Sequence, residues 1–188
     1  MSAPRLRLLE LLKTHAYAER EVILASGKPS TFYIDCKQAI LSAEGHFLVG
    51  TVICDLLSHI APEVRAVGGL TMGADPLAFG IAAIGALRGR SLRSFSIRKE
   101  AKDHGVTGRV AGALRPGDRV VITEDTTSRG TTIAEAVEVV RAFGAEPVLV
   151  LALVDRGGTA ARFAAEAGVP FVALATAPDL GFPYDGGA

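Results

Sequence analysis

The feature that most constrains the fold is an unbroken apolar run, VLVLALV, at residues 148–154, which ends at the acidic Asp155. A strand with one face in water alternates apolar and polar side chains, whereas a strand buried on both faces is apolar throughout. Strands of the second kind occur in parallel sheets whose two faces are covered by helices. The run therefore predicts an α/β fold with a buried parallel sheet.

Segments with strand and helix character alternate along most of the chain, as such a fold requires. Strands are predicted at 64–68, 92–98, 119–124, 147–154 and 169–174, and helices at 5–14, 44–60, 75–87, 131–143 and 159–167. Two short strand-like runs on either side of Gly27 and Pro29 predict a hairpin near the N-terminus. A chain of 188 residues suits one domain, so we expect residues 1–188 to form a single domain.

Charge and composition exclude several classes of protein. The 20 Lys and Arg residues balance the 20 Asp and Glu residues, whereas non-specific binders of nucleic acids or membrane surfaces carry a large basic excess. No apolar run approaches the ~18 residues that cross a bilayer, and the N-terminal residues lack the apolar segment of a signal peptide. Cys36 and Cys54 do not have the spacing of metal ligands. We expect a cytoplasmic protein with two ordinary thiols that binds neither nucleic acid nor membrane.

A long polar segment interrupts the alternation between the predicted strands 92–98 and 119–124. It is rich in charge and glycine and is longer than an ordinary connection, which favours a functional loop. Residues 88–115 hold eight basic and two acidic side chains, a local charge of +6 inside a neutral chain. A cationic loop suits a polyanionic ligand, and a solvated charged loop is the simpler alternative.

The strongest local motif follows the strand predicted at 119–124, where Glu124 and Asp125 precede a loop of Ser, Thr and Gly residues that opens a helix. Backbone N–H groups at a helix N-terminus, with nearby hydroxyls, form a cradle for a phosphate. The two carboxylates suit sugar hydroxyls, or Mg²⁺ held through water. Together they predict a ribose 5-phosphate site, and the alternative is an acidic strand end with a threonine cap.

Residues 119–132 resemble the phosphoribosyl pyrophosphate (PRPP) signature of the type I phosphoribosyltransferases. Three further stretches, 24–35, 68–76 and 98–105, resemble motifs of the orotate phosphoribosyltransferase family within that group. The four motifs lie in the order and spacing of the family, so the resemblance covers nearly the whole chain. It implies a parallel sheet flanked by helices, a small N-terminal hood to which residues 1–40 contribute, and a long flexible catalytic loop at 99–117.

The resemblance also implies the activity and its partners. The reaction is the transfer of ribose 5-phosphate from PRPP to N1 of orotate, which gives orotidine 5′-monophosphate and pyrophosphate in the de novo synthesis of the pyrimidine nucleotide UMP. Mg²⁺ is the implied cofactor. No residue binds it directly; PRPP carries it, and Glu124 and Asp125 hold it through water. A homodimer is implied, in which Lys99 acts in the partner's site.

Each site residue is carried over from the motif that it matches. The catalytic residues implied are Lys102, Lys99, Arg98 and His104. The residues implied to bind PRPP are Glu124, Asp125, Thr126, Thr127, Ser128, Arg129, Gly130, Thr131 and Thr132, together with Thr71, Met72 and Gly73 of the pyrophosphate loop. The residues implied to bind orotate are Lys28, Phe32, Tyr33, Ser128 and Arg156.

Two positions depart from the family pattern. Many relatives carry Lys or Arg where this chain has Met72 and Gly73, so the pyrophosphate loop would act through its backbone N–H groups. Arg129 stands where relatives usually carry a small residue, and the sequence leaves its direction open.

Several alternatives stay open at this point. Phe32 and Tyr33 also suit core packing, Arg156 suits a surface charge, and 68–76 suits an ordinary turn that starts a helix. The whole chain also suits a purine-type phosphoribosyltransferase or a PRPP-sensing regulatory protein of the same fold. Lys28 with Arg156 disfavours a purine, which has no carboxylate, and the lysines of the loop favour an enzyme.

Overall fold

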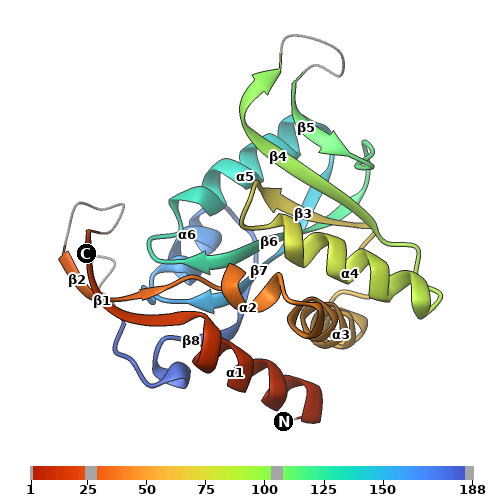
Figure 1. The fold of residues 1–188 in the computed structure, drawn as a ribbon. Helices are drawn as coiled ribbons and strands as arrows, with labels where there is room; N and C mark the ends of the chain where they lie inside the picture. Colours follow the sequence, from red (N-terminus) through yellow and green to blue (C-terminus); the bar gives the residue numbers. More distant parts are fainter. Residues whose placement is uncertain (1, 24–28, 103–107, 185–188) are drawn as a thin grey trace.

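A six-stranded sheet in the order β5-β4-β3-β6-β7-β8 forms the centre of the computed structural model, which describes residues 2–23, 29–102 and 108–184 (Figure 1). Of residues 18–23, 29–32 and 102 it describes the backbone only. The strands are β1 (Tyr17–Ile23), β2 (Pro29–Ile34), β3 (Ala66–Leu70), β4 (Arg93–Lys102), β5 (Gly108–Gly112), β6 (Arg119–Thr127), β7 (Glu146–Asp155) and β8 (Phe171–Thr176). The helices are α1 (Ala3–His15), α2 (Lys37–Ile40), α3 (Ala43–Ile60), α4 (Asp75–Leu87), α5 (Thr131–Ala142), α6 (Ala160–Glu166) and the 3-10 turn η1 (Pro178–Leu180).

The parallel sheet that the apolar runs predict is confirmed. Strands β3, β4, β6, β7 and β8 pair in parallel, and β5 pairs antiparallel with β4 at one edge. From residue 149 to residue 155 every residue of β7 is buried. Burial on both faces explains why this strand carries no alternation in its sequence.

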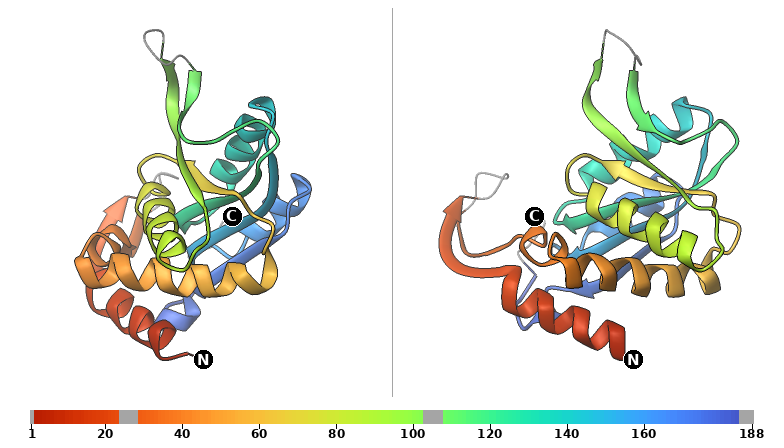
Figure 2. Two further views of the ribbon diagram at one scale, coloured as in Figure 1. Left: turned by 90° about the vertical axis from the view of Figure 1, so that its right-hand side faces the viewer. Right: turned by 45° about the vertical axis from the view of Figure 1, so that its right-hand side comes forward.

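Helices cover both faces of the sheet, as Figure 2 shows from two directions. Successive residues of a strand point to opposite faces, and β6 illustrates this. Val121 packs in the cluster formed with α1, α2, α3 and α4, whereas Val120 packs in the cluster formed with α5 and α6. The two clusters are the two halves of one core, with the sheet between them.

The N-terminal hairpin is also confirmed, as a separate two-stranded sheet of β1 and β2. It lies on the side of the central sheet where the carboxyl ends of β6 and β7 lie (Figures 1 and 2). Tyr17 at its base stacks on Phe182, with ring centroids 4.1 Å apart. This contact fastens the start of the hairpin to the C-terminal part of the domain.

Part of the segment at 99–117, which we expect to be a loop, forms regular strand. Strand β4 continues to Lys102, and residues 108–112 form β5, which pairs with it. An edge strand of partly exposed residues has no apolar pattern to reveal it, because one side of it faces water. The movement expected of 99–117 stays a prediction, and residues 103–107 lie outside the described part of the chain.

The close crossing of α3 and α4 generates a prediction about stability. A Cβ atom on Gly50 would lie 2.4 Å from the carbonyl oxygen of Gly80 and 2.7 Å from Cγ1 of Ile84. We expect Gly50→Ala to lower the free energy of unfolding by about 1–3 kcal/mol, because overpacking outweighs the better helix propensity of alanine. Chemical denaturation measures the effect. Ser58→Ala, on the exposed side of the same helix, serves as the control, and a Gly50→Ala variant as stable as the native chain would contradict the packing argument.

Candidate active site

The predicted motifs meet at the carboxyl ends of three neighbouring strands. Strand β3 pairs with β6, and β6 pairs with β7 as far as Thr127 and Asp155. The segments that follow these strands, 71–74, 128–130 and 156–159, therefore emerge side by side (Figure 1). In an open parallel sheet this edge is where ligands bind. The structure thus brings together three groups of predicted site residues that are far apart in the sequence.

The pyrophosphate loop lies against the acidic pair. A Cβ atom on Gly73 would lie 2.5 Å from Oδ1 of Asp125 and 2.9 Å from Oε1 of Glu124, so the backbone of this loop approaches both carboxyl groups closely. The loop is held by Asp75, which accepts hydrogen bonds from Oγ1 of Thr71 at 2.6 Å and Oγ of Ser96 at 2.7 Å. These contacts hold the turn at the start of α4 and place its backbone beside Glu124 and Asp125.

Met72 follows a cis peptide bond and is 64% exposed. Its side chain brings no charge to the loop. The departure from a basic residue at this point therefore leaves the backbone as the part of the loop that can meet an anion, as the sequence predicts.

The Ser/Thr/Gly loop is a tight turn that starts α5. Gly130 has φ +81°, and a Cβ atom there would lie 3.1 Å from atoms of Ala160 and Phe163, so both its conformation and its packing require glycine. The hydroxyl of Thr159 donates to the carbonyl oxygen of Ser128 at 3.0 Å. A Cβ atom on Gly157 would lie only 1.8 Å from that same oxygen. The segment after β7 thus braces the segment after β6.

This bracing leaves the N-terminus of α5 open. Thr131 and Thr132, its first two residues, are exposed, and so is Arg129. Free N–H groups at a helix start attract an anion. An exposed start of α5 is consistent with the predicted phosphate cradle, and the side chain of Arg129 is exposed beside it.

Arg156 is buried, with 8% of its surface exposed, so the alternative of a surface charge is wrong. Its Nε lies 3.2 Å from Oγ of Ser128, and its backbone N–H donates to the carbonyl oxygen of Thr127 at 2.8 Å. The two predicted orotate-binding residues Arg156 and Ser128 are therefore in contact, beside the phosphate cradle.

The structure describes several other predicted site residues only in part, or not at all. Arg98 and Lys99 lie on the part of β4 that continues past its last pairing with β3, at Leu70 and Ile97. Tyr33 is partly buried near the end of β2. The side chains of Phe32 and Lys102, and all of Lys28 and His104, lie outside the described part of the structure.

Lys37 is a site residue that sequence reasoning missed. Its Nζ lies 2.5 Å from Oδ2 of Asp125 and 3.7 Å from Oδ1 of Asp35. Desolvation lowers the pKa of Lys37, but the hydrogen bond to Asp125 and the charges of both aspartates raise it by more, so the net pKa lies above its usual value. The sequence carries no signal for the pair, because its two members are 88 residues apart.

The acidic pair itself is electrostatically strained. Burial, and then the charge of Asp125, raises the pKa of Glu124 to about 8, although a hydrogen bond from Thr132 and the charge of Lys37 act in the opposite direction. Two adjacent carboxylates away from bulk water do not ionise independently. The surroundings of Glu124 therefore favour its neutral form.

The donor set tests whether a metal fits here. Among the described residues, no group of three or more His, Cys, Asp or Glu side chains is placed to hold a metal ion. Oδ1 of Asp125 accepts the N–H of Thr126 at 2.8 Å, and Oδ2 accepts from Lys37. Carboxylate oxygens are hard donors, so the chemistry of Asp125 fits a hard divalent cation held through water.

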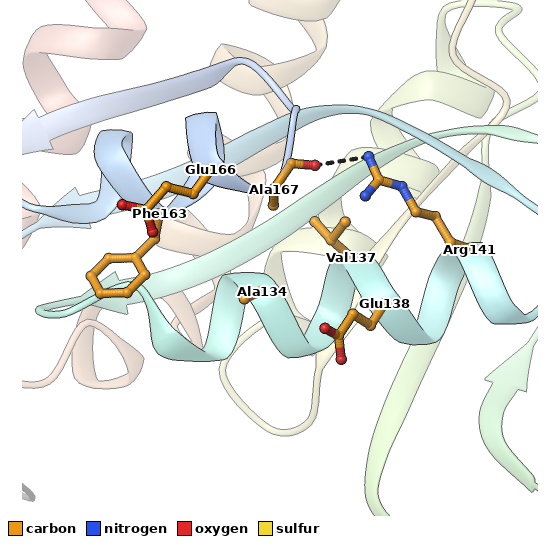
Figure 3. A pocket seen from close by; sticks show the side chains of 7 residues that line it. All are labelled: Ala134, Val137, Glu138, Arg141, Phe163, Glu166 and Ala167. Carbon is orange, nitrogen blue, oxygen red and sulfur yellow. Dashed lines mark hydrogen bonds between the residues drawn. The ribbon is translucent and has the colours of Figure 1, made fainter.

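A hollow of about 310 Å³ lies between α5 and α6 (Figure 3). Its lining residues are Ala134, Val137, Glu138, Arg141, Phe163, Glu166 and Ala167. Arg141 at its rim donates to the carbonyl oxygen of Ala167 at 2.8 Å. None of the predicted site residues lines this hollow, so we do not assign the substrate to it.

Relatives of known identity decide the family. No family model matches the chain. The orotate phosphoribosyltransferase of Sorangium cellulosum is 43% identical over 181 residues, which cover 95% of this chain and 94% of the relative. The chain belongs to the orotate phosphoribosyltransferase family. The family member of Streptomyces coelicolor is 42% identical over 182 residues, with 96% of this chain and 99% of the relative covered.

Solved structures agree with this membership. The crystal structure of the Mycobacterium tuberculosis orotate phosphoribosyltransferase in complex with PRPP matches with a TM-score of 0.80 at 31% identity, over 95% of this chain and 99% of that chain. The fold expected of a type I phosphoribosyltransferase is confirmed. No helix in the described ranges is long and apolar enough to cross a membrane.

The raised pKa of Glu124 generates a prediction about pH. Its native pKa of about 8 exceeds the ordinary value of 4.5, so the native state binds a proton that the unfolded state releases between these values. This contribution to the free energy of unfolding is complete below about pH 4.5 and is lost as the pH rises to 8. Glu124→Gln removes the ionisable carboxyl group, and with it this loss of stability at high pH. We expect the gain in melting temperature over the native chain to be larger at pH 9 than at pH 5, by roughly ten degrees.

Melting curves at the two pH values measure the difference. Glu138→Gln makes the same change at an exposed carboxylate on α5, and we expect it to shift both curves equally. A Glu124→Gln variant that also shows no pH-dependent difference would contradict the protonated state.

Proposed function

We propose that this site transfers the ribose 5-phosphate of PRPP to N1 of orotate, releasing orotidine 5′-monophosphate and pyrophosphate. Membership of the orotate phosphoribosyltransferase family supports the reaction and its place in pyrimidine nucleotide synthesis. The relative from M. tuberculosis that binds PRPP supports the sugar donor. These relatives favour an orotate enzyme over the purine-type and sensor alternatives.

The contact between Arg156 and Ser128 is the observation that carries the choice of base. The planar guanidinium of Arg156 is buried beside Ser128, and its shape and charge fit a carboxylate. Orotate has such a carboxylate and purine bases have none. Because Ser128 belongs to the loop that would hold the 5′-phosphate, the contact supports a base bound next to the sugar.

The sugar donor would be held at three points around this contact. Residues 128–132 at the start of α5 would hold the 5′-phosphate, and the carboxyl groups of Glu124 and Asp125 the ribose hydroxyls. The backbone N–H groups of 71–73 would hold the pyrophosphate. Mg²⁺ supplies positive charge to the pyrophosphate, and Glu124 and Asp125 would hold it through water.

Catalysis would consist of positioning and of stabilising charge, since orotate attacks without a covalent enzyme nucleophile. The ribose carbon gains positive charge as the bond to pyrophosphate breaks, and the leaving group gains negative charge. Lys102, assisted by Arg98, Lys99 and His104, would neutralise the leaving group. The extension of β4 beyond β3 supports this role, because it carries Arg98 and Lys99 past the end of the sheet.

The base would lie under the N-terminal hood. The hairpin carries Phe32 and Tyr33 on β2 and is followed by α2, which contacts the site through Lys37 and Asp125. Lys28 lies between its two strands in sequence. Together with Arg156, these residues would cover orotate and hold its carboxylate.

We propose a homodimer in which Lys99 acts in the partner's site. Large apolar side chains are exposed around α3, α4 and the pyrophosphate loop: Leu41, Phe47, Met72 and Phe79 are 49–64% exposed. Such a group favours a surface that another protein covers. Its position beside the site supports an interface at which one subunit can reach the other's substrate.

We also propose a cytoplasmic location. Both cysteines, Cys36 and Cys54, are buried free thiols. This state is typical of proteins in a reducing compartment.

The reaction is tested by incubating the purified chain with PRPP, Mg²⁺ and one base at a time. We expect orotate-dependent release of pyrophosphate and appearance of orotidine 5′-monophosphate, with no turnover of hypoxanthine or adenine, because only orotate presents a carboxylate to Arg156. Chromatography of the nucleotides measures the products. Turnover of a purine but not of orotate would refute the assignment.

The shared site is tested with two variants that each lack activity alone. A Lys99→Ala subunit keeps Asp125, and an Asp125→Ala subunit keeps Lys99, so a mixed dimer contains one complete site if Lys99 acts in the partner. We expect an equal mixture, unfolded and refolded together, to regain about a quarter of the native activity by random pairing. Each variant refolded alone is the control. A mixture no more active than its components would show that Lys99 acts within its own subunit.

A further inference from the structure

The turn between β2 and α2 places a lysine in the site. The backbone N–H of Asp35 donates to the carbonyl oxygen of Ala16 at 2.7 Å. The side chain of Asp35 accepts hydrogen bonds from the backbone N–H of Lys37 and from Nε2 of Gln38, both at 3.2 Å. Three hydrogen bonds thus fix Asp35 and the direction in which Lys37 leaves the turn.

The turn docks on the end of β6 through two neighbouring contacts. Nζ of Lys37 lies 2.5 Å from Oδ2 of Asp125, and Oγ1 of Thr126 lies 3.2 Å from Sγ of the buried Cys36. The side chain of Asp125 is only 6% exposed and that of Lys37 is 33% exposed. An ion pair shielded to this degree is stronger than a surface pair.

The charges around Asp125 pose a problem for an anionic substrate. Asp35 adds a second carboxylate near Lys37, and the pyrophosphate loop that touches Asp125 at Gly73 has only uncharged residues from Leu70 to Ala74. A sugar carrying a 5′-phosphate and a pyrophosphate is repelled by unpaired carboxylates. Lys37 is a cation that the described structure places against this group.

We propose that Lys37 is a positioning residue for the sugar pyrophosphate substrate. Through its ion pair it fixes the carboxylate of Asp125 and offsets its charge, so that the ribose hydroxyls and the pyrophosphate bind next to Gly73. This inference rests on the proposed function, and it gives the hood a part in binding PRPP as well as the base. Oδ1 of Asp125, on the side of Gly73, remains the oxygen that faces the substrate.

The substitutions Lys37→Met and Lys37→Arg separate charge from shape. Methionine keeps an unbranched side chain without charge, and arginine keeps the charge. We expect Lys37→Met to raise the KM for PRPP, and the dissociation constant of PRPP measured by calorimetry without orotate, by roughly tenfold. The KM for orotate should change less than about threefold, and Lys37→Arg should recover most of the PRPP affinity.

Lys13→Met serves as the matched control, because it removes one lysine charge from the exposed side of α1. We expect it to leave both KM values unchanged. A Lys37→Met variant with native affinity for PRPP would overturn the proposal. So would equal losses for PRPP and orotate, or equal losses in Lys37→Met and Lys37→Arg with a lowered melting temperature, since these describe a structural role.

The native chain separates this inference from the function on which it rests. If the native chain turns over neither orotate nor any other base with PRPP, the proposed function fails. If it turns over orotate and Lys37→Met retains native PRPP affinity, only the role of Lys37 fails.

Discussion

Two carboxyl groups, Glu124 and Asp125, stand side by side where β6 leaves the core, and like charges at that spacing repel strongly away from bulk water. Two features of the surroundings reduce this repulsion. The pKa of Glu124 is raised to about 8, which favours its neutral form, and the carboxylate of Asp125 forms an ion pair with Lys37. Gly73 then brings its backbone against both without a side chain. The hood, the pyrophosphate loop and the start of α5 are therefore all arranged around one acidic strand end.

The parallel sheet makes this arrangement possible. Because β3, β6 and β7 pair in register, their carboxyl ends deliver the three site segments to one edge. The buried apolar side chains of these strands form the core, the polar residues of β6 are concentrated toward its carboxyl end, and β7 ends at Asp155. A site that demands buried charge thus stands at the boundary between the most apolar part of the molecule and solvent.

Much of this architecture is predictable from sequence because it depends on local patterns. The apolar run at 148–154 identifies a doubly buried strand, and the acidic pair followed by Ser, Thr and Gly residues predicts the tight turn that starts α5. Strand β5 escapes prediction because an edge strand is half exposed. The role of Lys37 is not predictable from sequence because it depends on Asp125, which only the folded chain brings to 2.5 Å from Nζ of Lys37. Lys28 and His104 remain sequence predictions alone.

The bracing of the Ser128 turn by the segment after β7 has a consequence for selectivity. Thr159 donates to the carbonyl oxygen of Ser128, the backbone of Gly157 packs against that oxygen, and Arg156 contacts the hydroxyl, so the guanidinium and the predicted phosphate cradle are directly linked. In the proposed binding mode, the distance between them would have to match the distance from the carboxylate of the base to the 5′-phosphate of the sugar. A pyrimidine with its carboxylate on another ring carbon would meet the same guanidinium, yet would present the wrong ring atom to the ribose.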